Sequence, residues 1–310
     1  IPPPGTPDDQ IEWTNIAESS NPLYVTYKAP APENILEGYD WFHTLLQVGC
    51  AAAKYKSQDT EIINAIWARL QSKNINAADS GNRLYYYKEW GACTATTTFG
   101  LLRAEDGQCG SWARFFIDLL KMQGVDHSTI ADDFFHFSPD VADGFFVKNW
   151  RIERGLLPSF DPVFNYTCIP KQDTTSNWPD QIFEAGNQYN FHYTDFVNEN
   201  GLDGQGPNST PESIFGNHQI TQIDGQLLDP SYGKAFASLQ EIENEVVLGY
   251  YKLTIESINE NDYDFNFDGM PDDLNGDGQI QTNANVVLFM LTTDKSQFNL
   301  IRTSGEPINH

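Results

Sequence analysis

Basic side chains are scarce in this chain. It has 18 Lys and Arg against 43 Asp and Glu among 310 residues, a formal net charge of −25 at pH 7. Such a surface repels phosphate backbones and anionic headgroups, so nucleic acids and membrane surfaces are excluded as first-choice partners. Long apolar runs are missing too: the longest, residues 286–291, has the length of a strand. A membrane helix needs roughly 18 apolar residues, so we expect no membrane insertion.

Cysteine is also rare, which excludes a disulfide scaffold. The spacings of the four cysteines are not those of a metal site, and if one is a catalytic thiol, the other three allow one bridge and one spare. The chain begins without Met or an apolar segment, so we expect a mature secreted protein whose signal segment is gone. Hydrophobic residues make up 40% and aromatic residues 13%, which predicts a folded core. The cysteines are Cys50, Cys93, Cys109 and Cys168.

The order of the predicted elements indicates an α+β fold, with helices packed on an antiparallel sheet. Residues 1–20 read as a flexible lead-in, and residues 21–310 as one domain. Polar, Pro-rich and Gly-rich sequence predicts irregular connections over 153–214. Hydrophobic periodicity predicts helices at 37–55, at 60–70 with Thr60 as its cap, at 107–123 and at 236–247. Alternation predicts strands at 23–27, within 133–150, on both sides of Asp224-Gly225, and at 286–292, the last of the chain.

The segment Asp106-Gly107-Gln108-Cys109-Gly110-Ser111-Trp112-Ala113 places a cysteine in the first turn of a predicted helix. Backbone N–H groups at a helix start carry partial positive charge, which favours a thiolate. The same groups can hold a developing oxyanion. The alternative is an inert buried cysteine. In this helix the apolar residues are predicted to face inward and Arg114, Asp118 and Lys121 outward.

His218 is the histidine with the clearest partner. Asp224-Gly225 is a strong signal for a two-residue hairpin turn. Counting outward from that turn puts Asp229 opposite Ile220, which shares a face with His218, so Asp229 becomes the diagonal neighbour of His218. A carboxylate there can orient the imidazole and leave its other nitrogen for Cys109. The alternative is a surface histidine on a hairpin followed by a turn-forming Asp-Pro pair.

Two motifs together resemble the transglutaminase-like superfamily of papain-type cysteine enzymes. They are Gly-Gln-Cys-Gly-Ser-Trp-Ala at 107–113, and Asn-His at 217–218 followed by a hairpin and Leu-Asp-Pro-Ser-Tyr-Gly at 228–233. The likeness covers roughly residues 40–235 and is greatest to secreted bacterial members. It implies a catalytic triad of Cys109, His218 and Asp229 acting through a thioester. Many members carry Trp where Ile220 stands, and the hairpin here is shorter than usual.

The sequence leaves two candidates for a side chain that donates a hydrogen bond to the oxyanion in addition to the backbone N–H groups. Eukaryotic transglutaminases use a Trp upstream of the cysteine, and Trp90 resembles it, although a core aromatic residue is the alternative. Gln108 is a second candidate.

An acidic segment at 262–279 has the ligand spacing of calcium loops. Oxygen side chains fall at positions 1, 3, 5 and 9 with Gly at position 6, and an overlapping second register follows. The loops resemble those of dockerins and thrombospondin type 3 repeats, and all-oxygen donors favour calcium over zinc. We expect a structural calcium and no organic cofactor; an acidic Asx-rich turn is the alternative. The candidate ligands are Asp264, Asn266, Asp268, Asp272, Asp273, Asn275 and Asp277.

These observations predict an extracellular cysteine enzyme that cleaves amide or peptide bonds, or transfers the acyl group to an amine. Its expected partners are protein or peptide substrates. The rival prediction is a non-catalytic, calcium-stabilised binding or structural module of an extracellular assembly.

Overall fold

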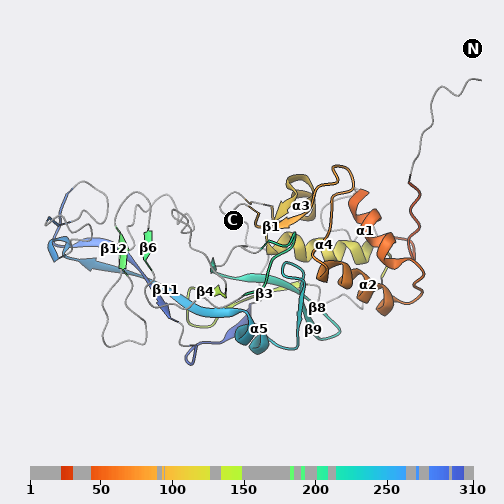
Figure 1. Ribbon diagram of the computed structural model, residues 1–310. Coiled ribbons are helices and arrows are strands. Elements are labelled where there is room, and N and C mark those ends of the chain that lie inside the picture. The colour runs from red at the N-terminus through yellow and green to blue at the C-terminus, as the bar shows by residue number, and fades with distance from the viewer. Residues whose placement is uncertain are drawn as a thin grey trace, which may run out of the picture.

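The computed structural model describes an α+β protein built from helices and mainly antiparallel strands. Helices α1 to α4 gather at one end of the molecule, and the long strands β11 and β12 extend toward the other (Figure 1). None of the helices within the described ranges is long and apolar enough to cross a membrane. The described residues are 22–30, 43–88, 93, 95–125, 134–148, 182–184, 190–192, 201–208, 214–262, 270–271, 279–292 and 295–303.

The helices largely follow the predicted apolar periodicity. α2 buries the five expected residues, from Ile62 to Leu70. The predicted cap was wrong: Gln58 is the N-cap and Thr60 lies inside the helix, while the Glu61 carboxylate accepts a hydrogen bond from the Ser57 N–H. The helices are α1 (His43–Ala53), α2 (Asp59–Gln71), α3 (Thr98–Ala104), α4 (Cys109–Met122) and α5 (Leu239–Glu245).

α4 is the central helix of the fold. It ends as predicted at Gly124, which has a φ of +67°, and the N–H groups of Gly124 and Val125 donate to the carbonyls of Lys121 and Leu120. The prediction that its charged residues face solvent was wrong for Asp118 and Lys121, which are both buried. The Thr98 hydroxyl donates to the Asp118 carboxylate over 2.6 Å. α4 packs against α1, α2 and α3 and also against β8, so most of its surface is buried. The spacing of its charged residues therefore does not indicate a solvent-exposed face.

Five antiparallel strands form the sheet that lies against α4, in the order β10-β9-β8-β3-β13. Four more form a second antiparallel sheet, in the order β12-β11-β4-β7. The strands of the first are β3 (Phe134–Pro139), β8 (His218–Ile223), β9 (Gln226–Asp229), β10 (Lys234–Phe236) and β13 (Leu300–Thr303). Those of the second are β4 (Gly144–Val147), β7 (Ile214–Phe215), β11 (Val247–Ile258) and β12 (Ala284–Thr292).

Two small sheets complete the strand pairing. β1 (Tyr85–Tyr86) pairs in parallel with β2 (Asp106–Gly107), and β5 (Ile182–Glu184) pairs with β6 (Asn190–His192). A short 3-10 helix, η4 (Glu260–Asp262), follows β11.

Several strand predictions need correction. Residues 23–27 are not a strand: they lie along the C-terminal ends of α1 and α4, with the Lys28 N–H bonded to the Gln123 carbonyl. The chain does not close on β12, because β13 returns to the edge of the first sheet. Helix α3 and strand β11 were not predicted at all. Neither segment has a simple pattern of apolar residues. β11 pairs with β4 and β12, which are distant from it in the sequence.

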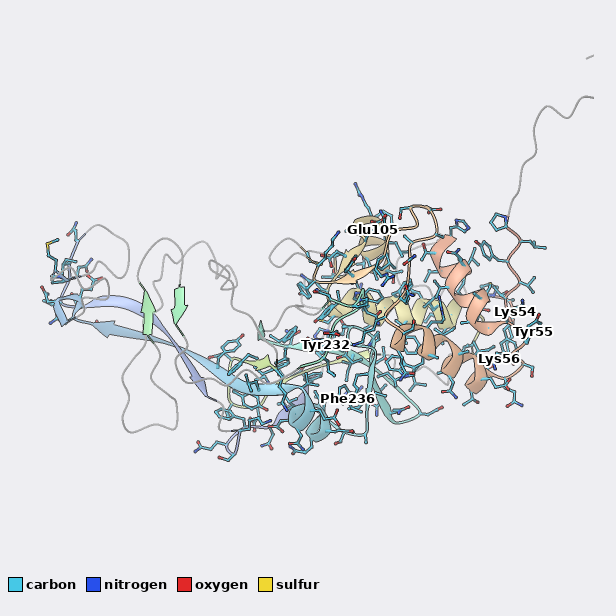
Figure 2. The ribbon with its side chains drawn as sticks, viewed as in Figure 1. Lys54, Tyr55, Lys56, Glu105, Tyr232 and Phe236 are labelled. Carbon is cyan, nitrogen blue, oxygen red and sulfur yellow. The ribbon has the colours of Figure 1, made fainter. Side chains whose placement is uncertain are left out.

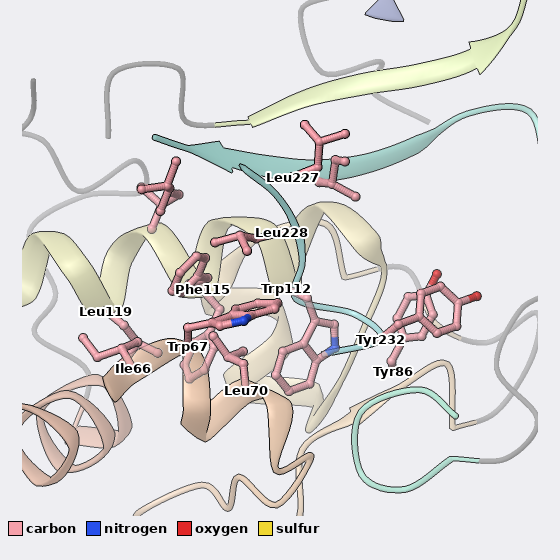
Figure 3. Packing of buried hydrophobic residues seen from close by; sticks show 14 of the residues in the cluster. Ile66, Trp67, Leu70, Tyr86, Trp112, Phe115, Leu119, Leu227, Leu228 and Tyr232 are labelled. Atoms are coloured by element: carbon pink, nitrogen blue, oxygen red, sulfur yellow. The ribbon is translucent and has the colours of Figure 1, made fainter. Parts of the chain in front are cut away.

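Buried side chains of α4 pack against the surrounding helices and against the first sheet. Trp112 and Phe115 of α4 pack among residues of α2 and of strand β9, as Figure 3 shows for Trp67 and Leu228. The Trp112 indole N–H also donates to the Tyr85 carbonyl of β1 over 3.1 Å. Burying a large aromatic side chain contributes about 1.5–3 kcal/mol, so these contacts hold the position of α4 firmly. The first turn of α4 is therefore fixed relative to β8 and β9.

Candidate active site

Cys109 is the first residue of α4, as the sequence predicted. Gln108 before it is extended, with φ −79° and ψ 174°, and its carbonyl accepts the N–H groups of Ser111 and Trp112. The N–H groups of Cys109 and Gly110 precede this first helical bond, so they belong to the positive end of the helix dipole. The Cys109 thiol is free and partly exposed. A nucleophile and two possible oxyanion donors thus stand together.

The turn into α4 requires a glycine at position 107. A Cβ added there would lie 2.1 Å from the Ser111 hydroxyl oxygen and 2.9 Å from Leu101 Cδ1. Both distances are far below van der Waals contact. The close approach lets β2 run directly into the helix and sets where Cys109 starts.

The hairpin of β8 and β9 has the predicted register. Ile223 pairs with Gln226 across the turn, and the next pairs outward follow in step. Asp224 and Gly225 have φ values of 51° and 79°, which is the two-positive-φ signature of a type I′ turn. This turn and register determine which residues of the two strands become neighbours.

His218 and Asp229 meet as the register predicted. The Nε2 atom of His218 lies 2.8 Å from Oδ2 of Asp229, and both side chains are buried. The other carboxylate oxygen, Oδ1, accepts N–H groups from Ser231 at 2.9 Å and Tyr232 at 3.3 Å. The Asp229 carboxylate is therefore held on both oxygens and cannot rotate away from the imidazole without losing hydrogen bonds.

Aromatic rings fix the orientation of the imidazole. The ring centroid of His218 lies 5.4 Å from Phe137, 5.1 Å from Phe215 and 5.9 Å from Tyr232. These ring contacts, edge-on for Phe137 and Phe215 and tilted for Tyr232, restrict the rotamer of His218 from several directions. Because Nε2 is directed at Asp229, the orientation of the ring also determines where the other nitrogen, Nδ1, points.

The other nitrogen, Nδ1, is the one left for the thiol. It is buried and makes no hydrogen bond within the part of the chain that the structure describes. Cys109 lies close enough to this imidazole to raise its pKa. Since Asp229 occupies Nε2, the thiol must approach Nδ1. One imidazole thus joins Cys109, from the start of α4, to Asp229 at the end of β9.

The protonation state of His218 follows from its surroundings. Burial alone would lower its pKa, but the Asp229 carboxylate, by charge and by hydrogen bond, and more weakly Cys109 raise the pKa to about 10. An imidazole with this pKa carries a proton at neutral pH. An imidazolium beside a cysteine is an arrangement suited to nucleophilic catalysis by the thiol.

Lys73 is a charged neighbour that the sequence did not suggest. Burial lowers its pKa, while the charges of Asp203 and Asp229 act in the opposite direction. Its ammonium group donates to the Asp203 carbonyl. The Lys73 ammonium group is therefore a second positive charge near Asp229, besides His218.

The other predicted site residues have different outcomes. The Gln108 side-chain amide donates to the Cys93 carbonyl over 2.8 Å, and its backbone N–H donates to Ala95, so Gln108 ties down the preceding loop. Trp90 lies outside the described residues, and so does Cys168; the Cys50 thiol is free. The seven candidate calcium ligands between 264 and 277 also lie outside the described residues. The described part of the chain contains no group of three or more His, Cys, Asp or Glu side chains placed to hold a metal ion.

A cavity of about 650 Å³ lies away from the triad, between residues 23–27 and the C-terminal end of α1. Lys54, Tyr55 and Lys56 line it, and Figure 2 shows them well separated from Tyr232, the neighbour of His218. None of the triad residues contributes to its walls.

Comparison of the chain with protein-family models, with curated proteins and with solved structures finds no match. The inference of function therefore rests on the residues and their geometry.

Proposed function

We propose that this protein is a cysteine-dependent acyl-transfer enzyme of transglutaminase-like type, which acts on amide or peptide bonds. The observation that carries the proposal is the position of His218, whose imidazole engages Asp229 through Nε2 and the Cys109 thiol through its other side. Nucleophile, base and orienting carboxylate are the three parts that covalent catalysis by a thiol needs.

The reaction follows from the order of these contacts. The Cys109 thiolate attacks the carbonyl carbon, and the π electron pair moves onto the carbonyl oxygen. When the tetrahedral intermediate collapses, the C–N bond breaks, and the His218 imidazolium gives its proton to the departing amine. A thioester with Cys109 remains. Asp229 holds the imidazole in the productive orientation throughout and balances its positive charge.

The thioester then passes its acyl group to water or to an amine. Neutral His218 removes a proton from the incoming nucleophile, whose attack breaks the C–S bond and releases Cys109 as the thiolate. Water gives a peptidase or amidase and an amine gives a transamidase. We favour hydrolysis, because secreted bacterial proteins with similar motifs are more often regarded as hydrolases.

The fold supports the same proposal. A helix that starts at the nucleophile and packs on an antiparallel sheet carrying His and Asp is the arrangement that the transglutaminase-like resemblance implies. Secretion and a structural calcium at 262–279 are further parts of the proposal, and they rest on the sequence.

Alkylation of the thiol with iodoacetamide tests the proposal within one chain. Cys109 and Cys50 are both free and partly buried, but Cys50 faces the amide of Gln123 instead of an imidazole. At mildly acidic pH, about 5–6, Cys109 is expected to react much faster than Cys50, because a nucleophile of the proposed kind reacts as a thiolate and an ordinary thiol stays protonated at this pH. The rates are measured by peptide mass spectrometry.

Two outcomes contradict the proposal. Equal and slow alkylation of Cys109 and Cys50 would favour the non-catalytic binding module. Full hydrolysis of a peptide or activated-ester substrate by the Cys109→Ala variant would exclude Cys109 as the nucleophile. The His218→Gln variant serves as a second check, since it is expected to slow alkylation of Cys109 and leave Cys50 unchanged.

A further inference from the structure

Gln219, the residue after His218, has a buried side-chain amide. Its side chain is 4% exposed, and its Nε2 atom has no hydrogen-bond partner among the described residues. A buried N–H without an acceptor carries an unmet desolvation cost, and such groups are rare unless something outside the protein satisfies them. The Gln219 amide nitrogen is therefore a hydrogen-bond donor that is available to an acceptor on a bound molecule.

The amide lies at the start of the cysteine helix. A Cβ built on Gly110 would be 2.6 Å from Oε1 of Gln219 and 3.7 Å from its Cδ. Two consecutive residues of β8 thus meet the first two residues of α4: His218 meets Cys109, and Gln219 meets Gly110. Glycine at position 110 leaves the room that the amide occupies.

We infer that the Gln219 amide N–H is the side-chain donor of the oxyanion hole, beside the backbone N–H groups at the start of α4. This inference rests on the proposed function. When Cys109 attacks, the carbonyl oxygen gains the π electron pair as a negative charge. Nε2 of Gln219 donates to that oxygen until collapse re-forms the C=O bond and expels the amine. The donor needs no other role, which explains why it is unpaired before substrate binds.

Gln219 fits this task better than Gln108. The Gln108 amide already donates to the Cys93 carbonyl, which orients it toward the preceding loop. Donors placed before the reaction are the effective ones, because they stabilise the charge without reorganising.

The test compares two reactions of the same thiol. Acetylation of Cys109 by p-nitrophenyl acetate passes through an oxyanion, whereas alkylation by iodoacetamide does not. The variant is Gln219→Met, which keeps the approximate size of the side chain and removes the amide donor without adding a charge. The control is Gln222→Met, the same chemical change on the same strand, at a side chain that bonds the Gly225 carbonyl and Arg302. Thermal melts establish that each variant is folded.

We expect the Gln219→Met variant to acetylate Cys109 about 10²–10³-fold more slowly, which is the usual effect of losing one oxyanion donor. Alkylation should keep its wild-type rate, and the control should keep both rates. Unchanged acetylation in a folded Gln219 variant overturns the assignment and leaves the proposed function standing. A parallel loss of both reactions also overturns it, since Gln219 would then act on the thiolate. If the wild-type chain forms no acetyl-Cys109, the proposed function and this inference fail together.

Discussion

The Nε2 atom of His218 lies 2.8 Å from Oδ2 of Asp229, across a hairpin whose turn is Asp224-Gly225. The pair is buried, and the carboxylate is fixed by two backbone N–H groups in the turn that follows β9. The contact couples the local geometry of a β-hairpin to the charge on an imidazole.

Replacing Asp229 with Asn should lower acylation by about 10²–10⁴-fold, because an amide cannot balance the imidazolium and can favour the wrong tautomer. The melting temperature should fall as well, since a buried imidazole loses its charged partner. The matched control is Asp224→Asn, which makes the same change in the exposed turn, where Asn-Gly forms the same type of turn. Equal activity of the two variants would remove Asp229 from the mechanism.

The contribution of His218 to stability should depend on pH in a defined direction. Its pKa is raised from the ordinary 6.5 to about 10 in the folded chain, so the folded state holds the proton more tightly than the unfolded state. The resulting stabilisation is complete below about pH 6.5 and is lost as the pH rises through 10. The difference in melting temperature between the wild type and His218→Gln should therefore shrink between pH 7 and about 10. A constant or growing difference would contradict the assignment of the charged pair.

Gly107→Ala should destabilise the protein by roughly 1–3 kcal/mol, because the new methyl group would overlap the Ser111 hydroxyl and Leu101. Acylation should fall too, since the start of α4 would shift together with Cys109. Gly216→Ala is the control: it lies near His218 in sequence, but the nearest atom to an added Cβ is 3.7 Å away. Denaturant unfolding of both variants measures the difference, and equal losses would mean that the close approach at Gly107 does not matter.

Removal of calcium should lower the melting temperature if the acidic segment at 262–279 binds the ion. Without it, several carboxylates in one loop would repel one another. Melting curves with calcium and with an excess of chelator provide the measurement. Asp268→Asn together with Asp277→Asn should abolish the calcium-dependent part. An identical melting temperature under both conditions, with no calcium bound to the purified protein, would refute the prediction.

The sequence predicted local structure best where a short pattern specifies it. Turn chemistry at Asp224-Gly225 was sufficient for the register of β8 and β9 and hence for the His218–Asp229 contact. Glycines and apolar periodicity were sufficient for α4 and for Cys109 at its first position. The pattern failed for residues 23–27, where strand-like alternation finds no strand to pair with, and for β11, whose partners lie far away in the chain.

By itself, then, the sequence determined the two halves of the site: a cysteine that begins a helix, and a histidine and aspartate that share one hairpin. Both depend on interactions within a few residues, where backbone geometry leaves few alternatives. Only the tertiary structure decided that the halves meet, because packing of α4 against β8 brings together Cys109 and His218, which lie 109 residues apart in the chain. The same packing buries Asp118 and sets Gln219 against Gly110. Such contacts arise from the shape of the whole core, which no local pattern encodes.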